Sequence, residues 1–144
     1  MNSLKEYIKG TGWVKFIAVM SIGSGVLSIP IGILVIILGI YLWGNREIDR
    51  EIANILGAFL SIVGVIVIPI GISTIIAGIK LWRGAKNLEN YKNTEKEEDL
   101  KEALKNLLSY FTWYSRVDVL GLAILAIVLI LLLRIGIHSM SGLK

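Results

Sequence analysis

Three long apolar stretches dominate this chain of 144 residues, and its charged side chains gather between them and at the ends. Residues 16–45 and 52–79 contain no Asp, Glu, Lys or Arg, and residues 119–133 are all apolar apart from Gly121. About 20 apolar residues in a helix cross the ~30 Å hydrocarbon layer of a bilayer. The stretches do not alternate between apolar and polar positions, as the strands of a membrane β-barrel do. The pattern therefore predicts an all-α integral membrane protein that forms a single membrane domain over 1–144.

An internal repeat occupies the first two apolar stretches. The segment from Gly25 to Trp43 reads GVLSIPIGILVIILGIYLW, and the segment from Gly64 to Trp82 reads GVIVIPIGISTIIAGIKLW. They align without a gap, and 13 of the 19 positions are identical. Repeats in membrane proteins often mark duplicated structural units. We therefore place a first repeat at 13–45 and a second at 52–84.

Glycines recur every seven residues within both repeats. Seven residues make nearly two helical turns, so these glycines share one face of a helix. Small residues on one face let the backbones of membrane helices approach closely. We expect a role in helix packing for Gly25, Gly32, Gly39, Gly57, Gly64, Gly71 and Gly78.

A proline near the middle of each repeat, Pro30 or Pro69, leaves the topology open. As one helix, residues 13–43 would be about 46 Å long, and a kink at the proline would help to fit it into a bilayer. Alternatively, each repeat turns at its proline and forms a hairpin of two short helices, since proline suits the first turn of a helix. The first arrangement gives three membrane spans and the second gives five.

The last third of the chain predicts an amphipathic helix over 94–116 that runs into a last span at 117–137. Thr94 and Glu97 fit a capping box, with Thr94 as the N-cap. Apolar residues then recur at helical spacing and form one stripe, which comprises Leu100, Leu104, Leu107, Leu108 and Phe111. A short external tail at 138–144 follows the span.

Aromatic and basic residues predict how the chain sits in the plasma membrane. Trp and Tyr gather at membrane–water interfaces, and the expected anchors are Trp13, Trp43, Trp82, Trp113 and Tyr114. The segment 80–118 carries eight basic residues, whereas the C-terminal tail carries only Arg134 and Lys144. The first 15 residues carry Lys5, Lys9 and Lys15. Because basic residues favour the cytoplasmic side, we expect residues 1–12 and the segment 80–118 in the cytoplasm. An odd number of spans then places the C-terminus outside.

The sequence offers little chemistry. There is no cysteine and a single histidine, His138, so neither a thiolate site nor a metal site with three or four ligands is expected. The membrane-embedded parts of the repeats, 16–45 and 52–79, contain no charged side chain, and their Ser and Thr hydroxyls are expected to bond to their own backbone. We predict no catalytic residue, no metal and no cofactor, and therefore no enzyme. The basic residues beside the spans favour contact with anionic lipid rather than nucleic acid.

Several motifs are similar to those of a known family. The start Gly12-Trp13-Val14-Lys15-Phe16 and the ending Gly78-Ile79-Lys80-Leu81-Trp82 resemble a group of uncharacterised prokaryotic multi-pass membrane proteins, known only as domains of unknown function. Members combine a Trp-Lys-Phe start, a glycine-rich apolar stretch with a Gly/Pro turn, a polar helical segment and one last span. The resemblance implies helical hairpins in the repeats, although this chain is shorter between Gly25 and Gly32. It implies no activity.

These features predict a non-enzymatic module that packs through its glycines. Its expected partners are membrane lipid, further copies of the chain or another membrane protein, so that it oligomerises or assembles a complex. The alternative is a small channel or transporter built from several copies, because helices interrupted by Pro and Gly can line substrate sites.

Overall fold

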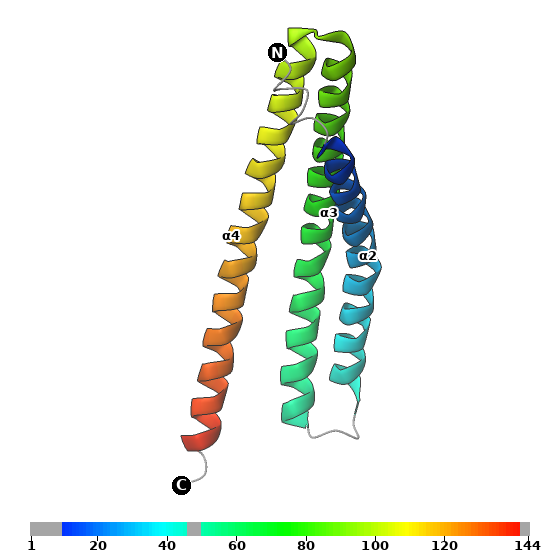
Figure 1. Ribbon diagram of the computed structural model, residues 1–144. Helices are drawn as coiled ribbons and strands as arrows, with labels where there is room; N and C mark the ends of the chain where they lie inside the picture. Colours follow the sequence, from blue (N-terminus) through cyan, green and yellow to red (C-terminus); the bar gives the residue numbers. More distant parts are fainter. Residues whose placement is uncertain (1–9, 46–49, 142–144) are drawn as a thin grey trace.

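The computed structural model describes residues 10–45 and 50–141. Among these it contains three α-helices and no strand: α2 (Thr11–Gly44), α3 (Arg50–Thr94) and α4 (Glu97–Ser141) (Figure 1). The prediction of an all-helical chain is confirmed for these residues. Two of the helices, α2 and α3, are long and apolar enough to cross a membrane. Their richness in Ile and Val does not prevent this, since surroundings override intrinsic helix propensity.

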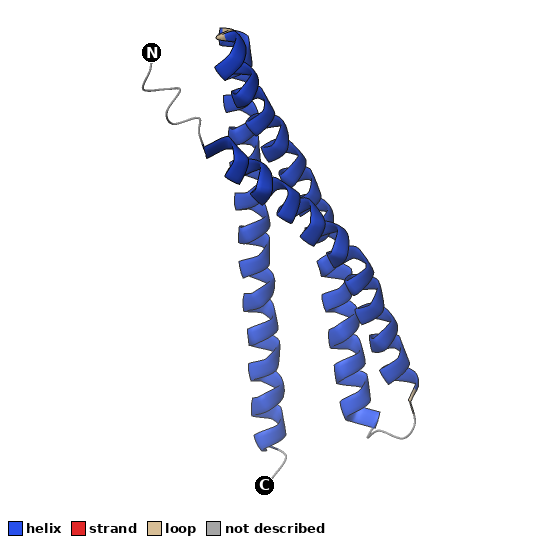
Figure 2. Cartoon of the chain, turned by 45° about the vertical axis from the view of Figure 1, so that its right-hand side comes forward, coloured by secondary structure: helices blue, strands red, loops and turns tan. Residues whose placement is uncertain are grey.

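In the view of Figure 1 the three helices run down, up and down along one common direction. α2 and α3 lie side by side and antiparallel over most of the length of α2 (Figures 1 and 2). α4 packs on the C-terminal part of α3 and then diverges from it, so that its far end stands apart from the α2–α3 pair in both views. The start of α2 and the end of α4 therefore lie towards opposite ends of the molecule.

The hairpin interpretation of the repeats, which the family resemblance favoured, is wrong. Pro30 lies inside α2 and Pro69 lies inside α3, and each helix continues on both sides of its proline. A proline removes one backbone hydrogen bond from a helix, but here buried glycines precede and follow it on the same helix and hold both halves against the partner. The proline positions are therefore neither turns nor helix ends.

The boundary between α3 and α4 also differs from the sequence prediction. Thr94 is the last residue of α3, not the N-cap of the next helix, and α4 begins at Glu97. The Thr94 hydroxyl lies 2.8 Å from the Asp99 carboxylate, and the turn is made at Glu95 with a φ of 55°. The predicted amphipathic helix and last span are one continuous helix, which also includes residues 138–141. The predictions for residues 1–9 and 142–144 lie outside the described residues.

Candidate functional site

The glycines of α2 and α3 face each other in pairs along the whole contact between the two helices. A β-carbon added to Gly25 would lie 2.6 Å from the carbonyl oxygen of Gly71, and one added to Gly71 would lie 2.9 Å from that of Gly25. Such distances are too short for any side chain, because the obstacle is backbone rather than a movable group. We call this contact the glycine seam; its pairs are Ala18–Gly78, Gly25–Gly71, Gly32–Gly64 and Gly39–Gly57.

The buried residues are small, and the exposed residues are large. In α2 the buried positions are Ala18 and three glycines, and in α3 Leu81 is the largest buried residue. The large apolar side chains point outwards instead: 72% of Trp13, 63% of Leu27 and 60% of Ile40 are exposed. In a water-soluble protein large apolar residues are the ones most often buried. In this helix pair the small residues are buried and the large apolar residues are exposed.

The seam has the symmetry of the sequence repeat. In the repeat alignment Gly25 corresponds to Gly64 and Gly32 corresponds to Gly71. The contact between Gly25 and Gly71 is therefore equivalent to the contact between Gly64 and Gly32. Because the two helices are antiparallel, exchanging the two repeats turns the seam end for end and reproduces its pairs. The packing surface of one repeat thus fits the packing surface of the other.

Several hydroxyl groups of the two helices bond to the backbone of their own helix. Ser24 and Ser28 donate to the carbonyl oxygens of Ser21 and Ser24, at 2.9 and 2.8 Å. Ser61 donates to Gly57 and Thr74 to Ile70, at 2.8 and 2.9 Å. Bonds of this kind satisfy a hydroxyl in an apolar environment. No described side-chain nitrogen or oxygen is buried without a partner.

The aromatic residues expected at the interfaces divide between the two ends of the seam. Trp13 begins α2 and Trp82 lies near the same end on α3, whereas Trp43 lies at the opposite end, where its backbone approaches Gly57. Trp113 and Tyr114 lie on the part of α4 that is near the first of these ends. The described anchors are therefore separated by almost the full length of α2.

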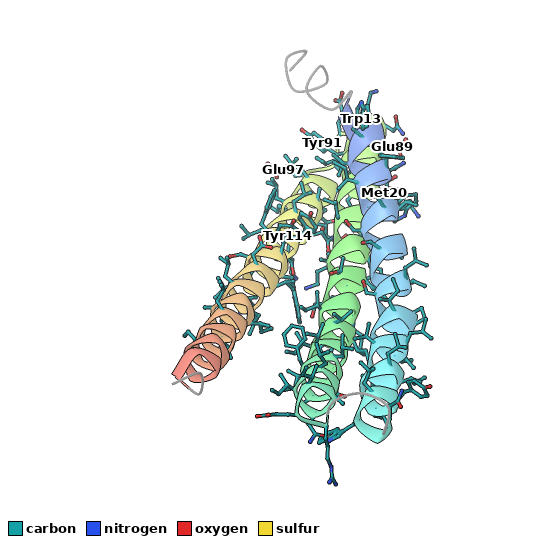
Figure 3. The ribbon with its side chains drawn as sticks, turned by 90° about the horizontal axis from the view of Figure 1, so that it is seen from below. Trp13, Met20, Glu89, Tyr91, Glu97 and Tyr114 are labelled. Carbon is teal, nitrogen blue, oxygen red and sulfur yellow. The ribbon has the colours of Figure 1, made fainter. Side chains whose placement is uncertain are left out.

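An ion pair joins α2 to α3 at the end marked by Trp13. Lys15 donates to the carboxylate of Glu89, and its ammonium group lies 5.8 Å from the centre of the Trp82 ring. Glu89 lies beside the first turns of α2, near the labelled Trp13 (Figure 3). The hydrogen bond from Lys15 and its positive charge lower the pKa of Glu89 below its ordinary value. The pair thus neutralises one lysine at this end.

A second lysine joins α3 to α4. The ammonium group of Lys80 donates to the Ser109 hydroxyl at 2.5 Å and lies 5.2 Å from the centre of the Trp113 ring. Close by, a β-carbon added to Gly84 would lie 3.1 Å from the Leu107 side chain, and Ala103 is fully buried. Gly84 and Ala103 were not among the predicted packing residues, because Gly84 falls outside the spacing of seven.

The described residues contain no group of three His, Asp or Glu side chains that could hold a metal ion. Between its first and last pairs the seam contains no charged residue, and it is closed by backbone contact. What the arrangement can do is hold two helices together and present apolar surface outwards. The geometry is that of a helix-packing site.

Comparison with known proteins identifies one relationship. No curated protein and no solved structure matches the chain. A family model described as a family of unknown function (DUF5362) matches residues 51–137, which are more than half of the chain and comprise most of α3 and α4. This match confirms the resemblance to an uncharacterised family. The chain belongs to the family of unknown function DUF5362.

Proposed function

We propose that this protein is a non-enzymatic integral membrane protein whose helix pair anchors an assembly surface in the plasma membrane. The observation that carries the proposal is the inverted distribution of side-chain size: small residues are buried in the seam and large apolar residues are exposed. Lipid solvates such a surface, whereas in water so much exposed apolar area promotes aggregation. Membrane helices associate through close backbone contact, because burial of apolar surface drives no association in lipid.

The proposed topology has three spans, at 16–45, 52–79 and 117–137. A helix of the length from Trp13 to Trp43 measures about 46 Å, which is close to the thickness of a bilayer with its headgroup regions. The N-terminus lies in the cytoplasm, because the basic residues of the N-terminal segment and of 80–118 fall on one side. The C-terminus lies outside. The last third of α3, residues 80–94, and the first part of α4, residues 97–116, then extend into the cytoplasm as a helical hairpin.

The two repeats form an inverted pair in this topology. Each repeat supplies one span, so the second repeat crosses the membrane in the opposite direction to the first. The equivalence of the Gly25–Gly71 and Gly32–Gly64 contacts supports this proposal. Because the glycines of α2 and α3 already contact each other within the chain, contacts with other proteins are made by the outer surfaces of the helices and not by these glycines.

The assembly surface that we propose is the outer flank of α4. Leu104, Leu108 and Phe111 recur at the spacing of one helix face, and they are 57%, 71% and 64% exposed. Apolar anchors with this spacing are typical of a helix that lies in the groove of a partner. We propose a second copy of the chain as this partner, which makes the protein a homo-oligomer.

Extraction and mass measurement test the two parts of the proposal separately. Membranes that contain the full chain are washed at alkaline pH, and the protein is then purified in mild detergent for native mass spectrometry. We expect the chain to stay in the membrane pellet and to form an oligomer that Leu108→Glu dissociates. Lys105→Ala, also exposed on α4, is the control and should leave the oligomer intact. Release by the wash contradicts membrane embedding; a wild-type monomer, or an oligomer unaffected by Leu108→Glu, contradicts the assembly surface.

A further inference from the structure

The two lysines at the cytoplasmic end differ in how their charge is balanced. Lys15 and Lys80 each lie over the ring of a tryptophan on the neighbouring helix. Lys15 is neutralised by the carboxylate of Glu89, whereas the hydrogen-bond partner of Lys80 is the uncharged hydroxyl of Ser109. Among the described residues, Lys80 therefore keeps its positive charge without an acidic partner.

A second cation lies on the same flank of the α3–α4 contact. Arg83 follows Lys80 by three residues, so both side chains lie on one face of α3, and Arg83 is exposed. Further along this flank, the carboxylate of Glu102 accepts a hydrogen bond from the Asn87 amide at 3.4 Å. The flank thus offers two cations, a hydroxyl and an indole ring, and the carboxylate of Glu102 is hydrogen-bonded to Asn87.

Apolar surface continues from this cationic end towards the middle of the proposed membrane. Ile76 and Ile72 precede Lys80 by four and eight residues and so continue its side of α3, and Ile72 is 47% exposed. On α4, Leu120 follows Trp113 by seven residues and is 60% exposed. α4 diverges from α3 over this stretch (Figures 1 and 2). Two exposed apolar helix flanks therefore begin beside Lys80.

We infer that the Lys80–Arg83 flank binds the phosphate headgroup of an anionic phospholipid of the cytoplasmic leaflet, whose acyl chains lie along the diverging flanks of α3 and α4. The lysine stem follows the apolar surface and carries its ammonium group to headgroup height. Each cation near the membrane surface increases the binding of anionic lipid about fivefold. The inference rests on the proposed membrane embedding. The lipid site lies at the α3–α4 contact and is separate from the glycine seam.

Native mass spectrometry of the full chain in detergent tests the site. The protein is mixed with equal amounts of dioleoyl phosphatidylglycerol and dioleoyl phosphatidylcholine, and the retained lipid is counted. We expect preferential retention of phosphatidylglycerol, reduced about fivefold in Lys80→Gln and more strongly when Arg83→Gln is added. Lys80→Arg should retain the preference. Lys15→Gln is the matched control, because Lys15 is already paired with Glu89, and it should bind the lipid like the wild type.

Two further arms distinguish the possible outcomes. Soluble glycerol phosphate at the same concentration as the lipid should not displace phosphatidylglycerol; displacement would mean that the site binds a free phosphate and would overturn the lipid assignment. Equal retention by the wild type and Lys80→Gln, or an equal loss in Lys15→Gln, would overturn the site itself. Circular dichroism of each variant confirms that its helices are intact. Because membrane embedding is tested by the alkaline wash, a failure here leaves the proposed function standing.

Discussion

Gly23 and Gly25 stand two positions apart on α2, but a side chain would meet very different surroundings at the two positions. A β-carbon on Gly23 would have no atom within 4 Å, whereas one on Gly25 would press on the backbone of Gly71. Composition alone does not separate the two residues, because both are glycines in an apolar helix. The difference comes from which face of the helix meets α3.

We expect Gly25→Ala to destabilise the protein by about 1–3 kcal/mol, because the added methyl group forces two backbones apart. Gly23→Ala, its matched control, should be neutral or should stabilise by up to ~1 kcal/mol, since alanine is the better helix former. Thermal unfolding followed by circular dichroism in detergent measures both. Equal effects of the two substitutions would show that the helices do not touch at the seam.

Glu89 makes the stability of the end of the molecule marked by Trp13 depend on pH. Its pKa in the folded protein lies below the ordinary value of 4.5, chiefly because of the hydrogen bond from Lys15 and next because of its positive charge. A lowered pKa means that the pair stabilises the fold above pH 4.5 and that this contribution is lost as the pH falls through the folded pKa.

Glu89→Gln should therefore flatten the fall in melting temperature that the wild type shows on acidification from neutral pH to about pH 3. Lys15→Gln should remove the same component, because it removes the other member of the pair. Melting curves of the three proteins across this range measure the effect. A wild-type curve parallel to both variants would mean that the ion pair does not form in solution.

At the scale of the helices, the apolar pattern was enough to predict helices and the face on which their glycines lie. The spacing of seven also held a signal that we did not use, because Ala18 precedes Gly25 by seven residues and Ala85 follows Gly78 by seven, and both alanines are fully buried. The choice between a continuous helix and a hairpin could not be made from Pro30 alone. That choice depends on contacts with the partner helix, which a local pattern does not contain.

The contact between α3 and α4 was harder to predict. The leucines of α4 read as one stripe in the sequence, but α4 turns only one edge of it towards α3. Leu107 lies against the position of Gly84, while Leu104 and Leu108 are exposed. A residue's spacing fixes its helix face but not the direction from which a neighbour arrives.

Reciprocal contact across the seam predicts coupled substitutions. Gly32 and Gly64 face each other, so once Gly32→Ala has moved the helices apart, Gly64→Ala should cost less than it does alone. We expect a coupling of about 0.5–3 kcal/mol in a double-mutant cycle. Gly32→Ala combined with Gly84→Ala is the control, and it should be additive because Gly84 faces α4. Additive effects at Gly32 and Gly64 would contradict direct contact.

For the whole molecule, the number of helices decides which loops share a side of the membrane. Three spans put the turn between α2 and α3 outside and the turn between α3 and α4 in the cytoplasm. Five spans would put both turns on the cytoplasmic side and expose the proline regions outside instead. The structure joins each repeat into one helix, and charge agrees with it, because the 45–51 segment carries three acidic and two basic residues. A loop rich in basic residues is retained in the cytoplasm, whereas a segment without such an excess can be placed outside.

Single cysteines in this cysteine-free chain test the arrangement directly. In intact cells, an impermeant maleimide should label Asn45→Cys but not Ser28→Cys or Val67→Cys, which lie in the middle of α2 and α3. Asn93→Cys, near the end of α3, should be labelled only after the membrane is opened. Asn45 and Val67 respond oppositely to three and five spans, because a hairpin would expose Val67 outside and keep Asn45 inside. Asn93 reports the orientation, because a reversed chain would expose it outside. Labelling of Ser28→Cys with protection of Asn45→Cys would therefore overturn the continuous helices and, with them, the seam that depends on their full length.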